Sequence, residues 1–300
     1  MKTVVTGSHG FVGSWLCKNL ALPLTRQFDI ILDKAHDVTL RDVRKKIVQD
    51  TDCIIHLAGV SGVNKCEKDE KNAFLVNAEA TIELAKEAKR AGVNRFIFAS
   101  SASVYGEAGQ YLIDEVHPTS PRNVYGRTKL AAERIIQMNS HDFRVVILRK
   151  SNVYGFGTMW KGITVIDQFL EKYIANQPIS IQGTGGQKRD FVHIQDVVRT
   201  YAQIATAKKV RSGIYNIGGL EPISLDGLAN MINLIGQSIF GYRSNIEYTP
   251  DIVNGVNWHD FKYDWSKARM EFQYYPVFTL DDYIKERLML EMRNRCGNQA

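Results

Sequence analysis

The sequence predicts an α/β fold built on a doubly wound parallel sheet, and three observations indicate this. Short apolar runs recur along residues 1–150 and are typical of buried strands. Helical patterns separate these runs, and strands that alternate with helices form parallel sheets covered on both faces. The chain has 300 residues, of which 44% are apolar, so it is long enough to bury a large core.

The predicted strands are short and mostly apolar. They cover residues 3–6, 29–32, 53–57, 95–100 and 144–148. The predicted helices between them cover residues 11–21, 41–49, 70–91 and 124–139. Because this alternation makes the strands parallel, their carboxyl ends line one edge of the sheet, where such folds bind ligands.

Beyond residue 149 the alternation gives way to shorter elements. Helices are expected at residues 161–176, 194–207, 225–238 and 279–293, joined by turns that contain Gly and Pro. We expect residues 1–150, joined by later segments near 188–217, to form a cofactor-binding domain. Residues 151–300 would mainly form a smaller C-terminal lobe that closes over the carboxyl edge and binds the substrate.

Charge and composition exclude several classes of protein. The chain carries 38 Lys and Arg against 32 Asp and Glu, a formal net charge of +6. These cations are scattered and form no basic block, so we expect no nucleic acid as a partner. No run reaches the roughly 18 apolar residues of a membrane span, and no apolar signal segment precedes the first strand. We therefore expect a cytoplasmic protein with no membrane partner.

The four cysteines do not form a recognisable metal or disulfide pattern. Cys17, Cys53, Cys66 and Cys296 have neither CxxC spacing nor neighbouring His clusters. We expect no bound metal and no disulfide, as is typical of a reducing compartment.

A glycine-rich turn follows the first predicted strand. The segment Thr6-Gly-Ser-His-Gly-Phe-Val-Gly13 joins that strand to a helix, the setting in which such a motif binds a dinucleotide. Gly7 permits the tight turn, Gly10 lets the backbone approach a pyrophosphate, and Gly13 lets the helix pack closely on the sheet. Free N–H groups at the helix N-terminus would donate to the phosphates. The turn therefore predicts a Rossmann-type cofactor site.

An acidic residue after the second predicted strand bears on the choice of cofactor. Asp33 lies 20 residues after Gly13, where a carboxylate can accept hydrogen bonds from the ribose hydroxyls of adenosine. It would repel a 2′-phosphate, which favours NAD over NADP. The adjacent Lys34 could offset that repulsion, so NADP stays open, and an ordinary surface carboxylate is the alternative interpretation of Asp33.

A tyrosine and a lysine four residues apart suggest a catalytic pair. Tyr125 and Lys129 would lie on one face of a helix. The lysine and a positive nicotinamide ring would both lower the pKa of the phenol toward neutrality, so that it exchanges a proton with a substrate hydroxyl during hydride transfer. Such pairs also occur by chance on helices. Here Ser101 follows the fourth predicted strand, where its hydroxyl can hydrogen-bond the same reacting oxygen.

Together these motifs resemble the extended short-chain dehydrogenase/reductase family, in its NAD-dependent sugar-nucleotide epimerase and dehydratase branch, whose members include UDP-glucose 4-epimerases. The matching segments extend over nearly the whole chain. They are Thr6–Gly13, Asp37-Val38, His56–Gly59, Asn77, Ser100–Gly106, Tyr125–Lys129, Asn152–Gly155, Arg189–Phe191 and Tyr215–Gly218.

The resemblance implies roles for the matching residues. Catalysis would depend on Ser101, Tyr125 and Lys129. With Asp33 and Lys34, the cofactor would be held by Gly7, His9, Gly10, Phe11, Val12, Gly13, Asp37, Val38, Leu57, Ala58, Gly59, Asn77, Ser100, Tyr125 and Lys129. The nucleotide-sugar substrate would contact Ser101, Ser103, Tyr125, Asn152 and Arg189. The resemblance also implies a homodimer, formed through the helix after Asn77 and the helix that carries Tyr125.

Two departures from the family narrow the expected activity. The 4,6-dehydratases of the family carry an Asp-Glu pair after the catalytic hydroxyl residue, where this chain has Ala102 and Ser103. Because elimination of water needs an additional acid and base, we expect no dehydratase activity. An Arg that grips the substrate diphosphate in many relatives is missing from residues 249–259, where Trp258 or His259 could replace it.

We therefore expect an NAD-dependent epimerase that acts on a nucleotide sugar through a transient keto sugar. One alternative is an NAD(P)H-dependent 4-keto-sugar-nucleotide reductase or dehydrogenase, which would use the same residues and consume its cofactor. The short segment between the second predicted strand and Asp37 resembles such reductases. A second alternative is a non-catalytic protein of this fold that senses the cofactor. The combination of Ser101, Tyr125 and Lys129 argues against it.

Overall fold

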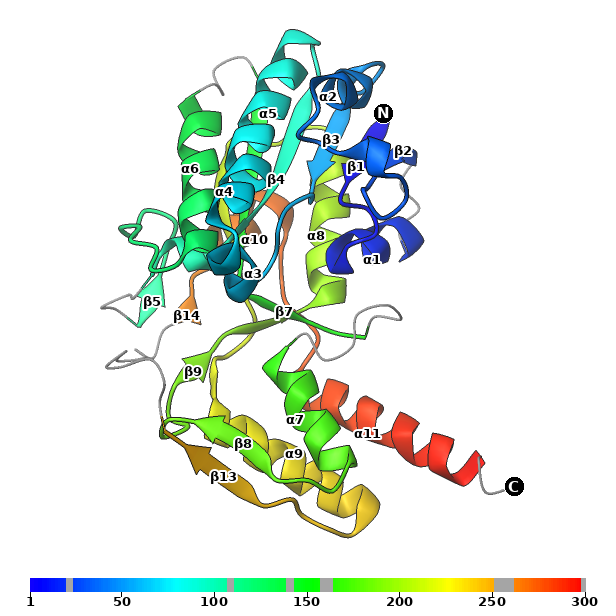
Figure 1. Ribbon diagram of the computed structural model, residues 1–300, viewed down its shortest axis with the longest axis vertical. Coiled ribbons are helices and arrows are strands. Elements are labelled where there is room, and N and C mark those ends of the chain that lie inside the picture. The colour runs from blue at the N-terminus through cyan, green and yellow to red at the C-terminus, as the bar shows by residue number, and fades with distance from the viewer. Residues whose placement is uncertain (20–23, 107–110, 139–142, 157–163, 251–261, 298–300) are drawn as a thin grey trace.

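Six parallel strands form the central sheet of the computed structural model (Figure 1). They are β1 (Thr3–Thr6), β2 (Leu24–Phe28), β3 (Cys53–His56), β4 (Arg95–Ser101), β6 (Arg144–Lys150) and β11 (Gly213–Ile217), in the order β2-β1-β3-β4-β6-β11. The structure describes residues 1–19, 24–106, 111–138, 143–156, 164–250 and 262–297.

The strand order reverses at β1. This strand pairs in parallel with β2 on one side and with β3 on the other. In open parallel sheets such a reversal marks the place where a ligand binds, beyond the carboxyl ends of the strands. Thr6 and His56 end β1 and β3 as register partners, so the segments that follow them start side by side. The predicted Rossmann-type doubly wound sheet is confirmed.

Helices cover both faces of the sheet. Successive strand residues point to opposite sides, so both faces carry apolar side chains that pack against helices. Val4 packs in one core and Val5 in the other. The core around Val4 is completed by α2 (Arg41–Val48), α5 (Thr81–Arg90) and α6 (Val124–Met138). The core around Val5 is completed by α1 (Phe11–Asn19), α8 (Ile194–Thr206) and α10 (Ser266–Phe272).

A third core lies beyond the sheet, in the lower part of Figure 1. We call its elements the small lobe: α7 (Val165–Ile174), β8 (Ile179–Gln182), α9 (Leu225–Phe240), β13 (Ile246–Thr249) and α11 (Leu280–Gly297). Strand β8 pairs in parallel with β13, and apolar side chains of the three helices pack against this pair. The chain enters the small lobe after β6 and later returns to the sheet to form α8 and β11.

Short elements connect these parts. In the first half they are η1 (Lys34–His36), α3 (Val63–Lys68), α4 (Glu70–Phe74), the π-helical turn η2 (Leu75–Ala80), η3 (Ala102–Val104) and β5 (Leu112–Ile113). In the second half they are β7 (Asn152–Tyr154), β9 (Lys188–Arg189), β10 (Phe191–His193), β12 (Ile223–Ser224) and β14 (Lys262–Tyr263). They form two-stranded pairs: β7 with β10, β9 with β12, and β5 with β14.

The prediction for the second strand is wrong. The strand covers Leu24–Phe28, and the predicted residues 29–32 form a turn in which Ile30, Ile31 and Leu32 are exposed. Strand β2 lies at the edge of the sheet, and edge strands tolerate polar residues. One of these, Arg26, donates to the carbonyl oxygen of Lys46 at 2.7 Å and so holds the end of α2. The exposed apolar turn was mistaken for the strand.

The other predicted elements are found at their places. Four strands and the predicted helices differ from the observed ones only near their ends, and residues 70–91 contain α4, η2 and α5 in succession. Predicted helical residues 20–21, 139 and 161–163 lie outside the described residues.

No helix in the described part of the chain has the length and apolar character to cross a membrane. Nor do three or more His, Cys, Asp or Glu side chains gather there as metal ligands. All four cysteines are free thiols.

Candidate active site

The glycine-rich turn after β1 is folded as tightly as its sequence predicts. Gly7 has a φ of 70°, and a Cβ on it would lie 2.5 Å from the Ala58 nitrogen. A Cβ on Gly13 would lie 2.0 Å from the carbonyl oxygen of Gly7. A Cβ on Gly10 would meet only that same oxygen within 4 Å, so the backbone is otherwise open at Gly10. The turn therefore fits a pyrophosphate placed against Gly10 and the N-terminus of α1.

The residues between these glycines are held by the core of the sheet and by the residue that follows β2. Phe11 and Val12 pack against the core around Val5. The backbone N–H of His9 donates to Asp29 Oδ2 at 2.7 Å.

A buried polar chain holds the two segments of the strand reversal together. Thr6 Oγ1 lies 2.6 Å from His56 Nδ1, and His56 Nε2 lies 2.9 Å from Thr81 Oγ1 on α5. Burial lowers the pKa of His56 to about 3, so the imidazole is neutral at physiological pH. The Ala58 N–H also donates to Thr6 Oγ1, at 3.4 Å. These hydrogen bonds fix Leu57, Ala58 and Gly59 beside the glycine-rich turn.

Asp29, rather than Asp33, is the acidic residue that directly follows β2. Its side chain is buried, and it accepts the N–H groups of His9 at 2.7 Å and Ile31 at 2.8 Å. Asp33 is exposed and caps η1 by accepting the Ala35 N–H at 2.8 Å. The prediction that Asp33 ends the second strand is wrong for the same reason as the strand itself. The carboxylate at the end of the strand lies 16 residues after Gly13.

The remaining residues predicted to bind the adenosine lie next to η1. Lys34 is exposed in this turn, and Asp37 ends it, accepting the Thr39 N–H at 2.8 Å. Val38 is buried in the core around Val4, so only its backbone faces away from the core.

The structure brings the three predicted catalytic residues together at the carboxyl end of β4. Ser101 ends this strand and caps η3, Tyr125 lies in the first turn of α6, and Lys129 is buried one turn later. The Ser101 hydroxyl lies near the Tyr125 phenol and favours its ionised form. Lys129 Nζ lies 5.8 Å from the centre of the Tyr125 ring. The arrangement places a hydroxyl, a phenol and an ammonium around one position.

Burial governs the protonation of this set. It raises the pKa of Tyr125 to about 12, although the nearby Ser101 hydroxyl acts in the opposite direction. It lowers the pKa of Lys129 to about 8. The expected lowering of the Tyr125 pKa toward neutrality is therefore not produced by the residues of the chain itself.

Asn77 joins α6 to the segment after β3. It lies in the π-helical turn η2, where its Oδ1 accepts the Val60 N–H at 2.8 Å and its Nδ2 donates to Thr128 Oγ1 at 3.1 Å. A Cβ on Gly59 would lie 2.8 Å from Asn77 Oδ1 and 3.5 Å from Lys129 Nζ. The side chain of Asn77 thus positions α6 against the segment that follows β3.

Ser100 and Ser101 face opposite sides of the sheet. Ser100 Oγ donates to Glu133 Oε1, and Arg149 Nη2 donates to Glu133 Oε2 at 2.7 Å. Arg149 and Glu133 are almost fully buried, with side chains 4% and 1% exposed. The Ser100 hydroxyl therefore belongs to a buried ion-pair network beneath α6, and only its backbone lies at the predicted cofactor site.

Gly126 allows α6 to approach the turn that carries Ser101. Asn123 caps this helix by accepting the Gly126 N–H at 2.8 Å. A Cβ on Gly126 would lie 2.6 Å from the Ser103 carbonyl oxygen and 2.8 Å from Pro121 Cβ. The sequence analysis missed this residue, although it directly follows Tyr125.

We expect Gly126→Ala to lower kcat by about tenfold to a hundredfold, because the added Cβ must push Tyr125 away from Ser101. Alanine is otherwise the better helix former, by about 1 kcal/mol. Steady-state kinetics of this variant should be compared with Arg127→Ala, since Arg127 is exposed on the same turn. Unchanged kcat in Gly126→Ala would show that this close approach does not position Tyr125.

The predicted substrate residues lie on both sides of the junction with the small lobe. Ser103 Oγ lies 3.0 Å from Ser101 Oγ, so Ser103 belongs to η3, the turn that follows Ser101. Asn152 is exposed on β7 and donates through Nδ2 to the Asp190 carbonyl oxygen at 3.0 Å. Arg189, the neighbour of Asp190, pairs through β9 with β12. Asn152 lies on β7, which pairs with β10, and Arg189 lies two residues before β10 in the chain.

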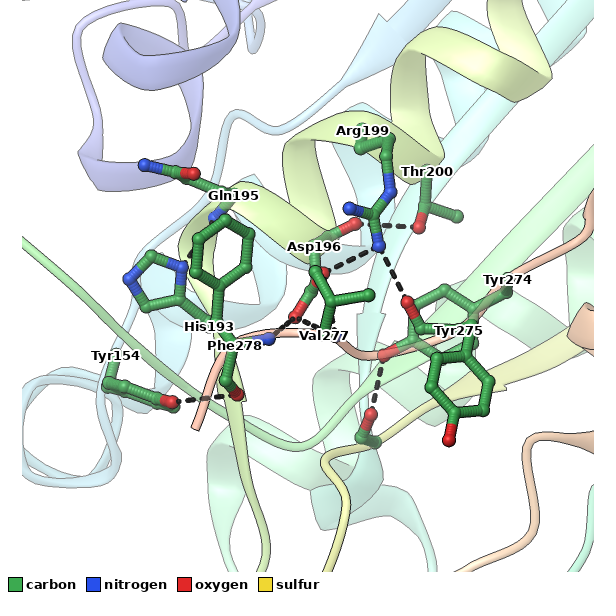
Figure 2. Close-up of polar contacts among 11 residues, drawn as sticks. Tyr154, His193, Gln195, Asp196, Arg199, Thr200, Tyr274, Tyr275, Val277 and Phe278 are labelled. Atoms are coloured by element: carbon green, nitrogen blue, oxygen red, sulfur yellow. Dashed lines mark hydrogen bonds and ion pairs between the residues drawn. The ribbon is translucent and has the colours of Figure 1, made fainter. Parts of the chain in front are cut away.

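The start of α8 anchors the small lobe to the sheet (Figure 2). Asp196 is fully buried and accepts the backbone N–H groups of Val277 at 3.2 Å and Phe278 at 3.3 Å. Arg199 donates both to Asp196 Oδ1 and to the Tyr275 carbonyl oxygen, each at 2.6 Å. These contacts fix the segment that leads from α10 into α11. No motif in our sequence analysis marked Asp196 for this role.

Lys150 and Tyr201 are two further residues that the sequence analysis missed. Lys150 ends β6 as the register partner of Ser101, and its Nζ donates to the Tyr201 hydroxyl on α8 at 3.2 Å. The signal in the sequence was a lysine two residues after the predicted apolar run 144–148. Trp258 and His259, considered above as replacements for a diphosphate-binding Arg, lie outside the described residues.

This chain is similar to one protein-family model and to several known proteins. The family model described as "NAD dependent epimerase/dehydratase family" matches residues 3–218. A putative UDP-glucose 4-epimerase of Methanocaldococcus jannaschii is 30% identical over 76% of this chain and 80% of that protein. A dTDP-D-glucose 4,6-dehydratase of Mus musculus is 33% identical over 82% of this chain and 69% of that protein.

A solved structure is similar over both the sheet and the small lobe. It is the UDP-glucuronic acid 4-epimerase of Bacillus cereus in complex with UDP-glucuronic acid and NAD. That chain is 26% identical to this one, with a TM-score of 0.81, and the match covers 98% of this chain and all of that one.

Proposed function

We propose, since this chain belongs to the NAD dependent epimerase/dehydratase family, that it is an NAD-dependent epimerase of a nucleotide sugar. The observation that carries the proposal is the meeting of Ser101, Tyr125 and Lys129 at the carboxyl end of β4. A reacting hydroxyl placed there meets a proton acceptor, a hydrogen-bond donor and a cation at once.

When bound, NAD supplies a hydride acceptor and donor, and its positive nicotinamide ring favours the ionised form of a neighbouring phenol. Tyr125 Oη takes the proton from the sugar hydroxyl while the carbon that bears this hydroxyl is oxidised to a ketone. Ser101 Oγ donates a hydrogen bond to the same oxygen, and Lys129 stabilises the tyrosinate. When the opposite face of the keto sugar is reduced, Tyr125 returns the proton, so no second substrate is consumed.

The turn after Ser101 favours epimerisation over dehydration. Ala102 is buried in η3, and the Ser103 hydroxyl is engaged with Ser101 at 3.0 Å. Neither side chain supplies the acid and base that elimination of water needs beside the sugar ring. The identity of 33% to a 4,6-dehydratase therefore does not by itself support dehydratase activity for this chain.

The cofactor would lie across the strand reversal at β1. The N-terminus of α1 and the glycine-rich turn suit the pyrophosphate, and Leu57, Ala58 and Gly59 would flank it. Asp37 and Val38 would contact the adenine. Asp29 is better placed than Asp33 to accept the ribose hydroxyls, because it lies at the end of β2 and already holds the N–H of His9.

We expect Asp29→Asn to weaken NAD binding by about tenfold to a hundredfold, because charge-assisted hydrogen bonds to the ribose are lost. The asparagine oxygen can still accept the His9 N–H, so the turn should remain folded. Discrimination against NADP should fall as well. Calorimetric titration with both dinucleotides measures this, and Asp33→Asn is the matched control with little expected effect. A larger loss in Asp33→Asn would return the ribose role to Asp33.

The substrate diphosphate would be bound by Arg189 and Asn152, where the small lobe joins the sheet. A guanidinium suits a diphosphate because it donates two parallel hydrogen bonds. Asn152 holds the backbone next to Arg189. The small lobe would then close over the sugar nucleotide, with the reacting sugar toward Ser101.

A homodimer in the cytoplasm is the assembly that we propose for this enzyme. The helices α5 and α6 lie side by side on one face (Figure 1), and Ile135 and Met138 of α6 are exposed there. Free cysteines support a reducing compartment. Light scattering coupled to size exclusion should give twice the mass of one chain, and a monomer at micromolar concentration would reject the dimer.

To test the function, the protein is incubated with NAD and with UDP-glucose, UDP-glucuronic acid or the 4-epimer of either. The sugar products and the absorbance of NADH are then measured. Interconversion of a 4-epimer pair without net change in NADH is the expected result. Stoichiometric NADH formation, or consumption of NADH with 4-keto sugars, would instead identify a dehydrogenase or reductase. Cofactor binding without any turnover would favour a sensing protein.

A further inference from the structure

Lys150 lies beside the catalytic set but belongs to a different strand. It is the register partner of Ser101 between the parallel strands β6 and β4, so the two side chains point to the same face of the sheet. Neighbouring strands lie about 4.8 Å apart. Lys150 Nζ donates to the Tyr201 hydroxyl at 3.2 Å, and α8 carries this tyrosine over that face.

The cation of Lys150 has no anionic partner in the described part of the chain. Its neighbour Arg149 shows the contrast, because Arg149 points to the other face and is bound by the Glu133 carboxylate. The partner of Lys150 is a fully buried phenol, whose pKa is raised by burial and by Tyr125, so it stays neutral. One hydrogen bond uses one of three ammonium donors. Such a half-buried cation favours an anion that arrives with a ligand.

The position of Lys150 indicates which anion this is. The glycine-rich turn that suits the cofactor pyrophosphate follows β1, which is three strands from β6, or about 14 Å. Arg189 and Asn152, assigned above to the substrate diphosphate, lie beyond the sheet on β9 and β7. Lys150 instead lies at the carboxyl end of β6, beside Ser101, which with Tyr125 holds the reacting hydroxyl. This position favours an anion that belongs to the sugar itself.

We propose that Lys150 binds a carboxylate of the sugar, and that the substrate is a nucleotide-linked uronic acid. In a hexuronic acid the carboxylate is attached to the ring carbon next to C-4. A hydroxyl at C-4 held by Ser101 and Tyr125 therefore brings the carboxylate toward a group one strand away on the same face. This inference rests on the proposed epimerase function and narrows its substrate class.

Protonation gives the proposal a second signature. Burial and the neighbouring Lys129 lower the pKa of Lys150 to about 7. The titratable groups near it are Lys129 and Tyr125 on α6 and Tyr201 on α8. Lys129 has a pKa of about 8, and burial raises the pKa of both phenols. A bound carboxylate favours charged Lys150, so its binding takes up a proton above pH 7. Affinity for a uronic acid should then fall as the pH rises from 6 to 8.5.

The test compares UDP-glucuronic acid with UDP-glucose, which differ only at C-6. Calorimetry on the NAD-loaded protein gives both dissociation constants, and kcat/KM is measured in parallel. We expect the wild-type protein to prefer UDP-glucuronic acid by at least tenfold at pH 6.5. In Lys150→Met this preference should shrink by about tenfold to a hundredfold. Lys285→Met removes an exposed lysine of α11 and should keep the wild-type preference.

Equal affinity of the wild-type protein for both sugars, or an unchanged preference in Lys150→Met, would overturn the inference. Should Lys150→Met fail to fold, the wild-type preference measured from pH 6 to 8.5 decides in its place, and a preference that does not fall with pH would count against Lys150. Failure of the proposed function is recognised separately. In that case neither sugar is epimerised, while the ratio of dissociation constants still tests Lys150.

Discussion

Tyr125→Phe is expected to lower kcat by about 10² to 10⁴-fold, because it removes the group that takes the proton from the sugar hydroxyl. The ring itself remains, so its packing beside Ser101 and Lys129 should be preserved. Steady-state kinetics measures the loss, and calorimetry should show an NAD affinity close to that of the wild-type protein. The expected signature is therefore a loss of kcat with binding retained.

Tyr111→Phe is the matched control, since this phenol is 55% exposed. It should retain wild-type kcat. Near-normal turnover in Tyr125→Phe would remove Tyr125 from proton transfer, whereas an equal loss of NAD affinity would show that the variant acts through binding.

Glu133→Ala is expected to lower the free energy of unfolding by about 3–5 kcal/mol, the usual cost of leaving one charge of a buried pair without its partner. Arg149 would keep its charge with a side chain 4% exposed, and Ser100 Oγ would lose its acceptor. Urea denaturation followed by circular dichroism measures the change. The loss of stability should be present without cofactor, since the network of Ser100, Glu133 and Arg149 lies beneath α6 and not at η3, the turn that follows Ser101.

Glu83→Ala provides the control for this comparison. Glu83 pairs with Lys86 three residues away on α5, and both side chains are about 40% exposed. Removing such a surface pair should cost less than about 1 kcal/mol. Similar losses in the two variants would show that the buried network contributes no more than an exposed ion pair.

The glycine-rich turn and the placement of Tyr125 beside Lys129 could be predicted because each depends on local sequence. The glycine-rich turn lies between one strand and one helix, and Tyr125 and Lys129 are one helical turn apart. Ser101 ends an apolar strand whose limits are clear. Each of these positions follows from a single turn, helix or strand, whereas the meeting of Ser101 with Tyr125 depends on the packing of α6 against β4.

The parts that could not be predicted depend on contacts between distant segments. Strand β2 needs apolar side chains less than the central strands do, so the exposed turn after it gave the stronger apolar signal, and Asp29 was overlooked. Lys150 and Tyr201 are 51 residues apart and meet only because α8 returns to the sheet. Asp196 likewise acts on Val277, which lies 81 residues later.

The repeated passage of the chain between the sheet and the small lobe has a consequence for how the protein folds during synthesis. When residue 150 leaves the ribosome, β6 is an open edge, because its partner β11 ends only at Ile217. The face that carries Val146 and Leu148 also stays uncovered until α8 has been made. The sheet is therefore completed late, and the nascent first half exposes an apolar surface of the kind that chaperones bind.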